Sequence, residues 1–251
     1  MTADLTTDLT TDLTPADVAR LARELYTTGS PVIRAMQHYR PYISPFEQLL
    51  QTVPPGSRVL DIGCGGGLFL GLLARTGRIQ RGHGIDTSAM AIAVADEMTA
   101  RLPAGHGLHF EARSAALPLP SAGYDVVALL DVMHHIPPQH QRGVLEQALR
   151  SVEPGGLLIY KDMVRRPRWR ALANRLHDLV IARQWIHYLP LQQAMAWAQA
   201  AGCTVVQQRD TNRLWYGHEL VVFRMPGNAL VGRPVSAPST PSPSPAPLPA
   251  P

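Results

Sequence analysis

Short apolar runs alternate with longer amphipathic stretches from about residue 55 to residue 225. The short runs are rich in Val, Ile and Leu and predict five strands, over Arg58–Ile62, Gly82–Asp86, Leu108–Ala112, Asp125–Leu130 and Leu157–Lys161. The segments between them predict helices over Leu68–Arg75, Ser88–Arg101 and Gln139–Ser151. Short strands joined by crossover helices indicate a parallel sheet covered on both faces.

The sheet is expected to close with two more strands, Thr204–Gln208 and Leu220–Arg224, after two further helical stretches. A short connection between them suits antiparallel pairing. Upstream, Thr14-Pro15 indicates an N-cap with proline at the first helical position. A second helical segment is expected near Pro45–Gln51.

The two ends of the chain differ in composition from the middle. Residues 1–14 repeat Asp-Leu-Thr-Thr and predict a disordered tail, and the proline-rich residues 226–251 predict another. Between them we expect a helical segment over 15–52 and a main domain over 53–225, with a basic helical insert over 163–200.

The composition limits the cellular compartment and the classes of partner that we expect. Hydrophobic residues make up 45% of the chain and charged residues 17%, as in globular proteins. Two cysteines, Cys64 and Cys203, give neither a disulfide framework nor a metal spacing. No basic, apolar leader and no run of membrane-spanning length is visible. A cytoplasmic protein is the expectation, and a net charge of +4 is too small to indicate nucleic acid.

Glycine is concentrated directly after the first strand, in "VLDIGCGGG" from Val59 to Gly67. Such a turn lets the backbone lie close to a ligand, and a following helix N-terminus favours negative charge. The dinucleotide pattern G-x-G-x-x-G fails from either Gly63 or Gly65, and no G-x-x-x-x-G-K-[ST] is present. The pattern that fits is D-x-G-x-G-x-G from Asp61 to Gly67.

With this motif the chain resembles the class I S-adenosylmethionine (SAM)-dependent methyltransferases, over about residues 55 to 225. "GHGIDTS", "GYDVVALLDVMHHI" and "SVEPGGLLIYKDM" resemble the family's second, fourth and fifth strands with their loops. The resemblance implies an α/β, Rossmann-like sheet of seven mostly parallel strands with one antiparallel strand, helices on both faces and an N-terminal helical lid. It also implies SAM as the cofactor.

The resemblance further implies a set of cofactor contacts. Gly63 and Gly65 would hold the methionine part, with Asp61 and Cys64 in the same loop. Asp86, 23 residues after Gly63, would hold the ribose. The remaining contacts would be Thr87, Ala115 and Ala116 beside the adenine, with Leu117 flanking it, and Leu130 and Asp131 near the methionine amino group.

One position departs from the family pattern. Many relatives carry Asp before "A-x-x-L-P" to accept the adenine amino hydrogens, whereas this chain has Arg113 in "RSAALP". Arginine accepts no hydrogen bond. Either Ser114 or a backbone carbonyl replaces the missing acceptor, or the alignment slips by one residue.

Methyl transfer from a sulfonium depends on alignment and desolvation, and a base is needed only for a protonated nucleophile. His134 and His135, after the fourth strand, are the candidate bases or substrate contacts, with Asp131 and His140 nearby. Adjacent histidines point apart on regular backbone, so a metal site at His134, His135 and His140 is disfavoured. We expect no metal.

Three other segments are candidates for substrate or partner contact. "NRLWYGHEL", with Trp215, Tyr216 and His218, is expected as a loop that reaches the substrate. His38 or Tyr39 of the lid is a candidate to face the cofactor. The arginine-rich Arg165–Arg183 predicts an amphipathic helix that either covers the sheet or pocket, docks an acidic carrier protein or lies on an anionic membrane.

The leading hypothesis is methyl transfer to a small, lipophilic or carrier-bound acceptor, with oxygen favoured over nitrogen. No "N/D-P-P-Y/F" signature of nucleic-acid amino-methylating relatives appears. Carbon methylation of quinone or polyketide type and a non-catalytic SAM-binding protein remain alternatives, and an NAD-linked oxidoreductase is disfavoured by the glycine spacing.

Overall fold

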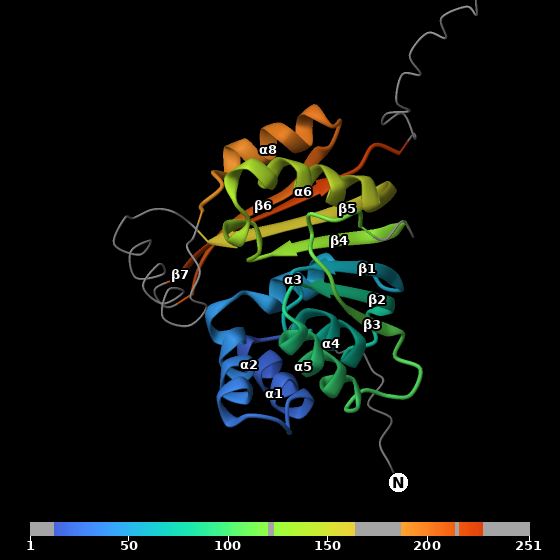
Figure 1. The fold of residues 1–251 in the computed structure, drawn as a ribbon, viewed down its shortest axis with the longest axis vertical. Helices are drawn as coiled ribbons and strands as arrows, with labels where there is room; N and C mark the ends of the chain where they lie inside the picture. Colours follow the sequence, from blue (N-terminus) through green and yellow to red (C-terminus); the bar gives the residue numbers. More distant parts are fainter. Residues whose placement is uncertain (1–12, 120–122, 164–186, 214–215, 228–251) are drawn as a thin grey trace, which may run out of the picture.

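A computed structural model describes residues 13–119, 123–163, 187–213 and 216–227. Within these ranges the chain forms a seven-stranded sheet in the order β3-β2-β1-β4-β5-β7-β6 (Figure 1). The strands are β1 (Ser57–Ile62), β2 (Ile79–Asp86), β3 (Leu108–Ala112), β4 (Tyr124–Leu130), β5 (Val152–Met163), β6 (Thr204–Arg213) and β7 (Tyr216–Arg224). Only β7 runs against its neighbours in this sheet, pairing antiparallel with both β5 and β6. The predicted α/β sheet is confirmed.

Helices cover both faces of the sheet, as Figure 1 shows. They are α1 (Pro15–Leu25), α2 (Pro31–Ile43), α3 (Phe46–Thr52), α4 (Leu68–Arg75), α5 (Ala89–Thr99), α6 (Pro138–Ser151) and α8 (Leu191–Ala200), with a 3-10 turn, η1, over Met133–His135. α4 and α5 contact β2 and β3 on one face, and α6 contacts β4 and β5 on the other.

The strands divide their side chains between two hydrophobic cores. Val126 and Ala128 of β4 lie in the core below α4, while Val127 and Leu129 lie in the core below α6. All four side chains are fully buried. Successive side chains of a strand point to opposite faces of the sheet. Because helices cover both faces here, β4 needs apolar residues on both sides, which explains why it is apolar over most of its length.

The N-terminal helices pack against α4 and extend that layer. α1 begins with the predicted cap: Asp17 N donates to Thr14 Oγ1 at 3.2 Å, and Thr14 N donates to the Asp17 carboxylate at 3.1 Å. Residues 1–12 and 228–251, which include most of the two predicted tails, lie outside the described ranges, as do residues 164–186 of the predicted insert.

Six of the seven strands are longer than the sequence predicts, and in two places the added residues were expected outside the sheet. The segment Pro154-Gly155-Gly156, which precedes the predicted strand Leu157–Lys161, lies inside β5, which starts at Val152. The pairing of β4 with β5 has a register shift between Tyr124 and Val126. The loop expected between the last two strands is largely strand. Its residues continue the antiparallel ladder from Arg209↔Leu220 to Arg213↔Tyr216, and this pairing satisfies backbone groups that an open loop would leave exposed.

Among the described residues, no helix is long and apolar enough to cross a membrane.

Candidate active site

A cavity of about 510 Å³ lies beyond the carboxyl ends of β1, β2 and β4. Open parallel sheets bind ligands at this position, where the strand order reverses. Here the reversal falls between β1 and β4. The wall is built from four turns, one after each of β1, β2, β3 and β4, together with one residue of α2 and two of α6.

The glycine turn after β1 approaches the cavity with backbone alone. Gly63 has φ +78° and donates its N–H to the Ile85 carbonyl at 2.8 Å, which ties the turn to the end of β2. A Cβ at Gly63 would lie 2.4 Å from Val132 Cγ2, so only glycine fits there. Gly63 and Gly65 line the cavity.

Asp86 connects three of the four turns. Its carboxylate accepts from Gly65 N at 2.9 Å and from Ser88 N at 2.8 Å, and its carbonyl accepts from Arg113 N at 2.8 Å. Asp86 and Thr87 both line the cavity. The carboxylate is therefore held by backbone donors at the edge of the wall, with the glycine turn in direct contact.

Asp61 and Cys64 belong to the same motif but do not line the cavity. Both are buried, at 2% and 6% exposure. Burial raises the pKa of Asp61 to about 7, Arg40 opposes this rise, and the negative Asp86 adds to it. One Asp61 oxygen, Oδ1, is buried without a hydrogen-bond partner among the described residues. Asp61 therefore lies directly behind the wall, and its Oδ1 is an available hydrogen-bond acceptor.

The turn after β3 brings Arg113, Ser114, Ala115 and Ala116 to the wall. The Arg113 guanidinium is 3.3 Å from the Glu111 carboxylate. Ser114 Oγ accepts from Ala116 N at 3.2 Å. Small side chains leave room for a flat group on this side. Ser114 is the only side-chain hydrogen-bond acceptor among these four residues.

The end of β4 is built differently, around a buried charge pair. Asp131 has φ +55°, the only positive φ outside glycine among the described residues, and its N–H donates to the Lys161 carbonyl at 2.8 Å. Its carboxylate pairs with Lys161, the only lysine of the chain, whose side chain is fully buried. Burial alone would raise the pKa of Asp131, but Lys161, His218 and His134 together hold it well below its usual range. Asp131 and Leu130 line the cavity.

The two adjacent histidines take different positions. His135 lines the cavity. His134 is 1% exposed and its Nδ1 contacts the Asp162 carboxylate. The two rings do not point apart as expected, and their centroids are 4.1 Å apart. Both residues lie in the 3-10 turn η1, where successive side chains project about 120° apart rather than to opposite faces as on a strand. Burial, and then His134, lower the pKa of His135 to about 4.

The other candidate segments lie away from the cavity wall. His38 is hydrogen-bonded to the Tyr26 carbonyl at 3.0 Å, and Tyr39 is 43% exposed. His218 is a buried residue of β7, and its Nε2 contacts the Ile43 carbonyl, so the loop expected to reach the substrate is a strand here. Trp215 and the stretch Arg165–Arg183 fall outside the described residues.

Sequence reasoning missed part of the wall. Arg40 of α2, Val132 and the apolar group Ile136, Pro137 and Val144 line the cavity without having been predicted. Arg40 directly follows the two lid candidates, His38 and Tyr39, on α2, and of these three residues only Arg40 is in the cavity lining. Lys161 was not predicted as a site residue, because its pairing with Asp131 follows from the β4–β5 register, which one sequence does not reveal.

Comparison with known proteins identifies the family. The family described as "methyltransferase domain" matches residues 34–208. A curated relative, the mitochondrial ubiquinone biosynthesis O-methyltransferase of Schizosaccharomyces pombe, is 29% identical over 140 residues, which are 54% of this chain and 47% of that protein. The chain spans about half to two thirds of the length of the curated relatives it matches.

Two solved structures share the fold. The N-methyltransferase NodS of Bradyrhizobium japonicum in complex with S-adenosylhomocysteine (SAH) has a TM-score of 0.58 at 21% identity, over 82% of this chain and 97% of that one. The [4+2]-cyclase SpnF has a TM-score of 0.60 at 18% identity, over 77% and 82%.

A doubly covered sheet with a glycine turn at its switch point is typical of nucleotide-binding proteins of the α/β class. The chain belongs to the class I SAM-dependent methyltransferases.

Proposed function

We propose that this protein transfers a methyl group from SAM to an oxygen of a lipophilic acceptor. The observation that carries the proposal is the arrangement of one cavity: a glycine turn and a carboxylate on one side, and a neutral histidine among apolar residues on the other. The relative from S. pombe, named as an O-methyltransferase, supports oxygen as the acceptor atom.

The residues present fit the cofactor. Gly63 and Gly65 have no side chain, so the methionine part of the cofactor would lie directly against their backbone. Asp86 would accept hydrogen bonds from the ribose hydroxyls. Thr87, Ala115 and Ala116 would flank the adenine. The amino group would lie near Leu130 and Asp131, whose lowered pKa keeps a negative charge there. Asp61 and Cys64 would support the turn from behind the wall.

When bound, SAM supplies an electrophilic methyl group on a positively charged sulfur. The protein's contribution is to hold the acceptor in line and to exclude water, and orientation of this kind is worth roughly 7–11 kcal/mol. Val132, Ile136 and Val144 provide an apolar wall against which a lipophilic acceptor would lie. The N-terminal helices contribute Arg40 to the same wall, which supports a role for residues 15–52 as a lid.

His135 is the candidate base. With a pKa lowered to about 4 it is neutral at pH 7 and carries a free electron pair to accept a proton from an acceptor hydroxyl. Such a weak base does not deprotonate a phenol in advance, so the proton leaves as the methyl arrives. His134 is then a positioning residue, since it contacts Asp162 and its ring lies against that of His135.

Activity is tested by incubating the full chain with SAM and a panel of phenols, catechols, carboxylic acids, quinones and carrier-bound acyl groups, with SAH as the readout. We expect turnover with a phenolic acceptor and a methoxy product by NMR. A methyl on ring carbon would instead establish the carbon-methylating alternative. SAH binding without turnover on any acceptor would establish the non-catalytic binder.

The base role is tested with His135→Ala. We expect kcat to fall by about 10²–10⁴-fold with the affinity for SAH unchanged, because the lost group acts on the acceptor. His140→Ala is the matched control, since His140 also lines the cavity but is exposed at its rim, and only a small change in kcat is expected. Equal kcat for wild type and His135→Ala would remove His135 from the mechanism.

A cytoplasmic location is part of this proposal, and the two unpaired cysteines support a reducing compartment. A carrier protein or membrane at Arg165–Arg183 stays a prediction, because that stretch lies outside the described residues.

A further inference from the structure

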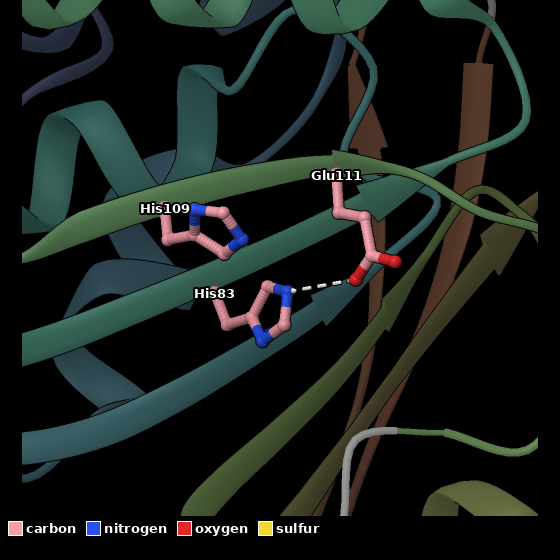
Figure 2. Close-up of side chains that lie close together, drawn as sticks. All are labelled: His83, His109 and Glu111. Carbon is pink, nitrogen blue, oxygen red and sulfur yellow. Dashed lines mark ion pairs between the residues drawn. The ribbon is translucent and has the colours of Figure 1, made fainter.

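A cluster of three metal-ligand side chains lies on β2 and β3, outside the cavity wall. His83, His109 and Glu111 each offer one ligand atom, and these atoms all lie within 4.8 Å of one another. Figure 2 shows the three side chains projecting to the same side of the two strands. His83 Nε2 is 3.6 Å from Glu111 Oε2.

Strand register explains why these residues meet. His83 pairs directly with His109 in the parallel ladder, and Glu111 follows two residues later on β3, so all three share one face. The residues between them, Gly84 and Phe110, belong to the opposite face, where a Cβ on Gly84 would meet the Phe110 ring. The arrangement is therefore fixed by backbone pairing.

Of the two histidines, His83 is the more buried, and a hydrogen bond already orients its ring. His83 Nδ1 is hydrogen-bonded to the Tyr124 hydroxyl at 3.0 Å. Its other nitrogen, Nε2, is buried without a hydrogen-bond partner among the described residues and faces Glu111. A second ring nitrogen held by an oxygen is the usual support of a metal-binding histidine.

We propose that His83, His109 and Glu111 bind one divalent transition-metal ion of the Zn²⁺ type. Two imidazoles and one carboxylate are the ligands such ions prefer, with water at the fourth position. With bonds of about 2.0–2.1 Å, ligand atoms of a tetrahedral site lie about 3.3 Å apart. The 3.6 Å between His83 and Glu111 is close to this, and His109 is exposed, with its ring centroid 4.9 Å from that of His83.

The ion would join the edge strand β3 to β2 across the ladder. Arg113 contacts the same carboxylate at 3.3 Å and also lines the cavity, so the site adjoins the turn after β3 without being part of the cavity wall. A ligating carboxylate held by a second residue is common in metal sites. The role we assign to the ion is structural, and it is independent of the methyl-transfer proposal.

The test is calorimetric titration of ZnCl₂ into the full chain after treatment with chelator and dialysis. Wild type is expected to bind one Zn²⁺ tightly, with no heat from MgCl₂ at the same concentration. His109→Ala removes an exposed ligand with little risk to folding and should weaken this binding at least tenfold. Glu111→Gln should weaken it as well.

His106→Ala is the matched control, because His106 precedes β3 by two residues and is outside the cluster. Its Zn²⁺ affinity should equal that of wild type. Co²⁺ in place of Zn²⁺ should give visible absorption bands that are lost in His109→Ala. Absence of Zn²⁺ binding by wild type, or equal affinity in wild type and His109→Ala, would overturn the proposal.

Discussion

The two sides of the cavity are built in different ways. On the side of β1 and β2 the wall is backbone: Gly63 and Gly65 present no side chain, and the Asp86 carboxylate is held by two N–H groups. On the side of β4 and β5 the wall is supported by charged side chains, where Asp131 forms an ion pair with the buried Lys161. The first side is preorganised by turn geometry, whereas the second depends on the partners of each charge.

This difference decides how each side responds to mutation. A backbone wall is broken by adding atoms, because its function is to leave space. A wall of buried charges is broken by removing one partner, because the other is then left without compensation in the protein interior.

Lys161→Met is expected to lower the free energy of unfolding by about 3–5 kcal/mol at pH 7, measured by urea denaturation. The substitution keeps the volume but leaves the half-buried Asp131 carboxylate without its cation. Arg142→Ala is the matched control, since Arg142 pairs with Glu146 on the surface of α6 at 64% and 35% side-chain exposure. Surface pairs contribute about 0–1 kcal/mol. Similar losses in the two variants would contradict the contrast.

Gly63→Ala is expected to cost about 2–3 kcal/mol, because φ +78° strains any residue with a Cβ and that Cβ would overlap Val132. The control is Gly143→Ala within α6, where a Cβ meets nothing within 4 Å. That change should stabilise the protein by about 0.5–1 kcal/mol. Thermal unfolding of both variants checks the pair, and a neutral Gly63→Ala would show that the turn needs no bare backbone.

Asp61→Asn should raise the free energy of unfolding at pH 8 by about 2–4 kcal/mol. The folded pKa, raised to about 7, lies above the unfolded value, so wild-type stability falls as pH rises from about 4 to 7 and stays reduced above it. Asparagine carries no such penalty. The two proteins should therefore have equal stability near pH 4, measured by urea denaturation across pH without cofactor. A parallel pair of curves would contradict the raised pKa.

The same contrast explains what the sequence predicted. The strand Leu108–Ala112 and the helix Leu68–Arg75 were predicted with their observed ends, because the spacing of apolar residues and the glycine turns are local signals. The placements of Gly63, Gly65 and Asp86 follow from one motif and one spacing. Charge partners that are distant in sequence left no local signal.

Three contacts illustrate this limit. Lys161 meets Asp131 through strand register, His134 of η1 meets Asp162 of β5, and His83 meets His109 across β2 and β3. Each pair is separated by 26 to 30 residues, and only the paired strands and the turns that follow them bring its members together. Arg40 reached the cavity from a helix whose orientation its apolar pattern did not settle.

The most direct test of the account is calorimetric titration of SAH into the purified chain and into Asp86→Ala. We expect one binding site in wild type and at least a tenfold weaker affinity in the variant, with the fold of both verified by circular dichroism. No binding by the folded wild-type protein, or equal affinity in the two proteins, would contradict the proposed SAM site.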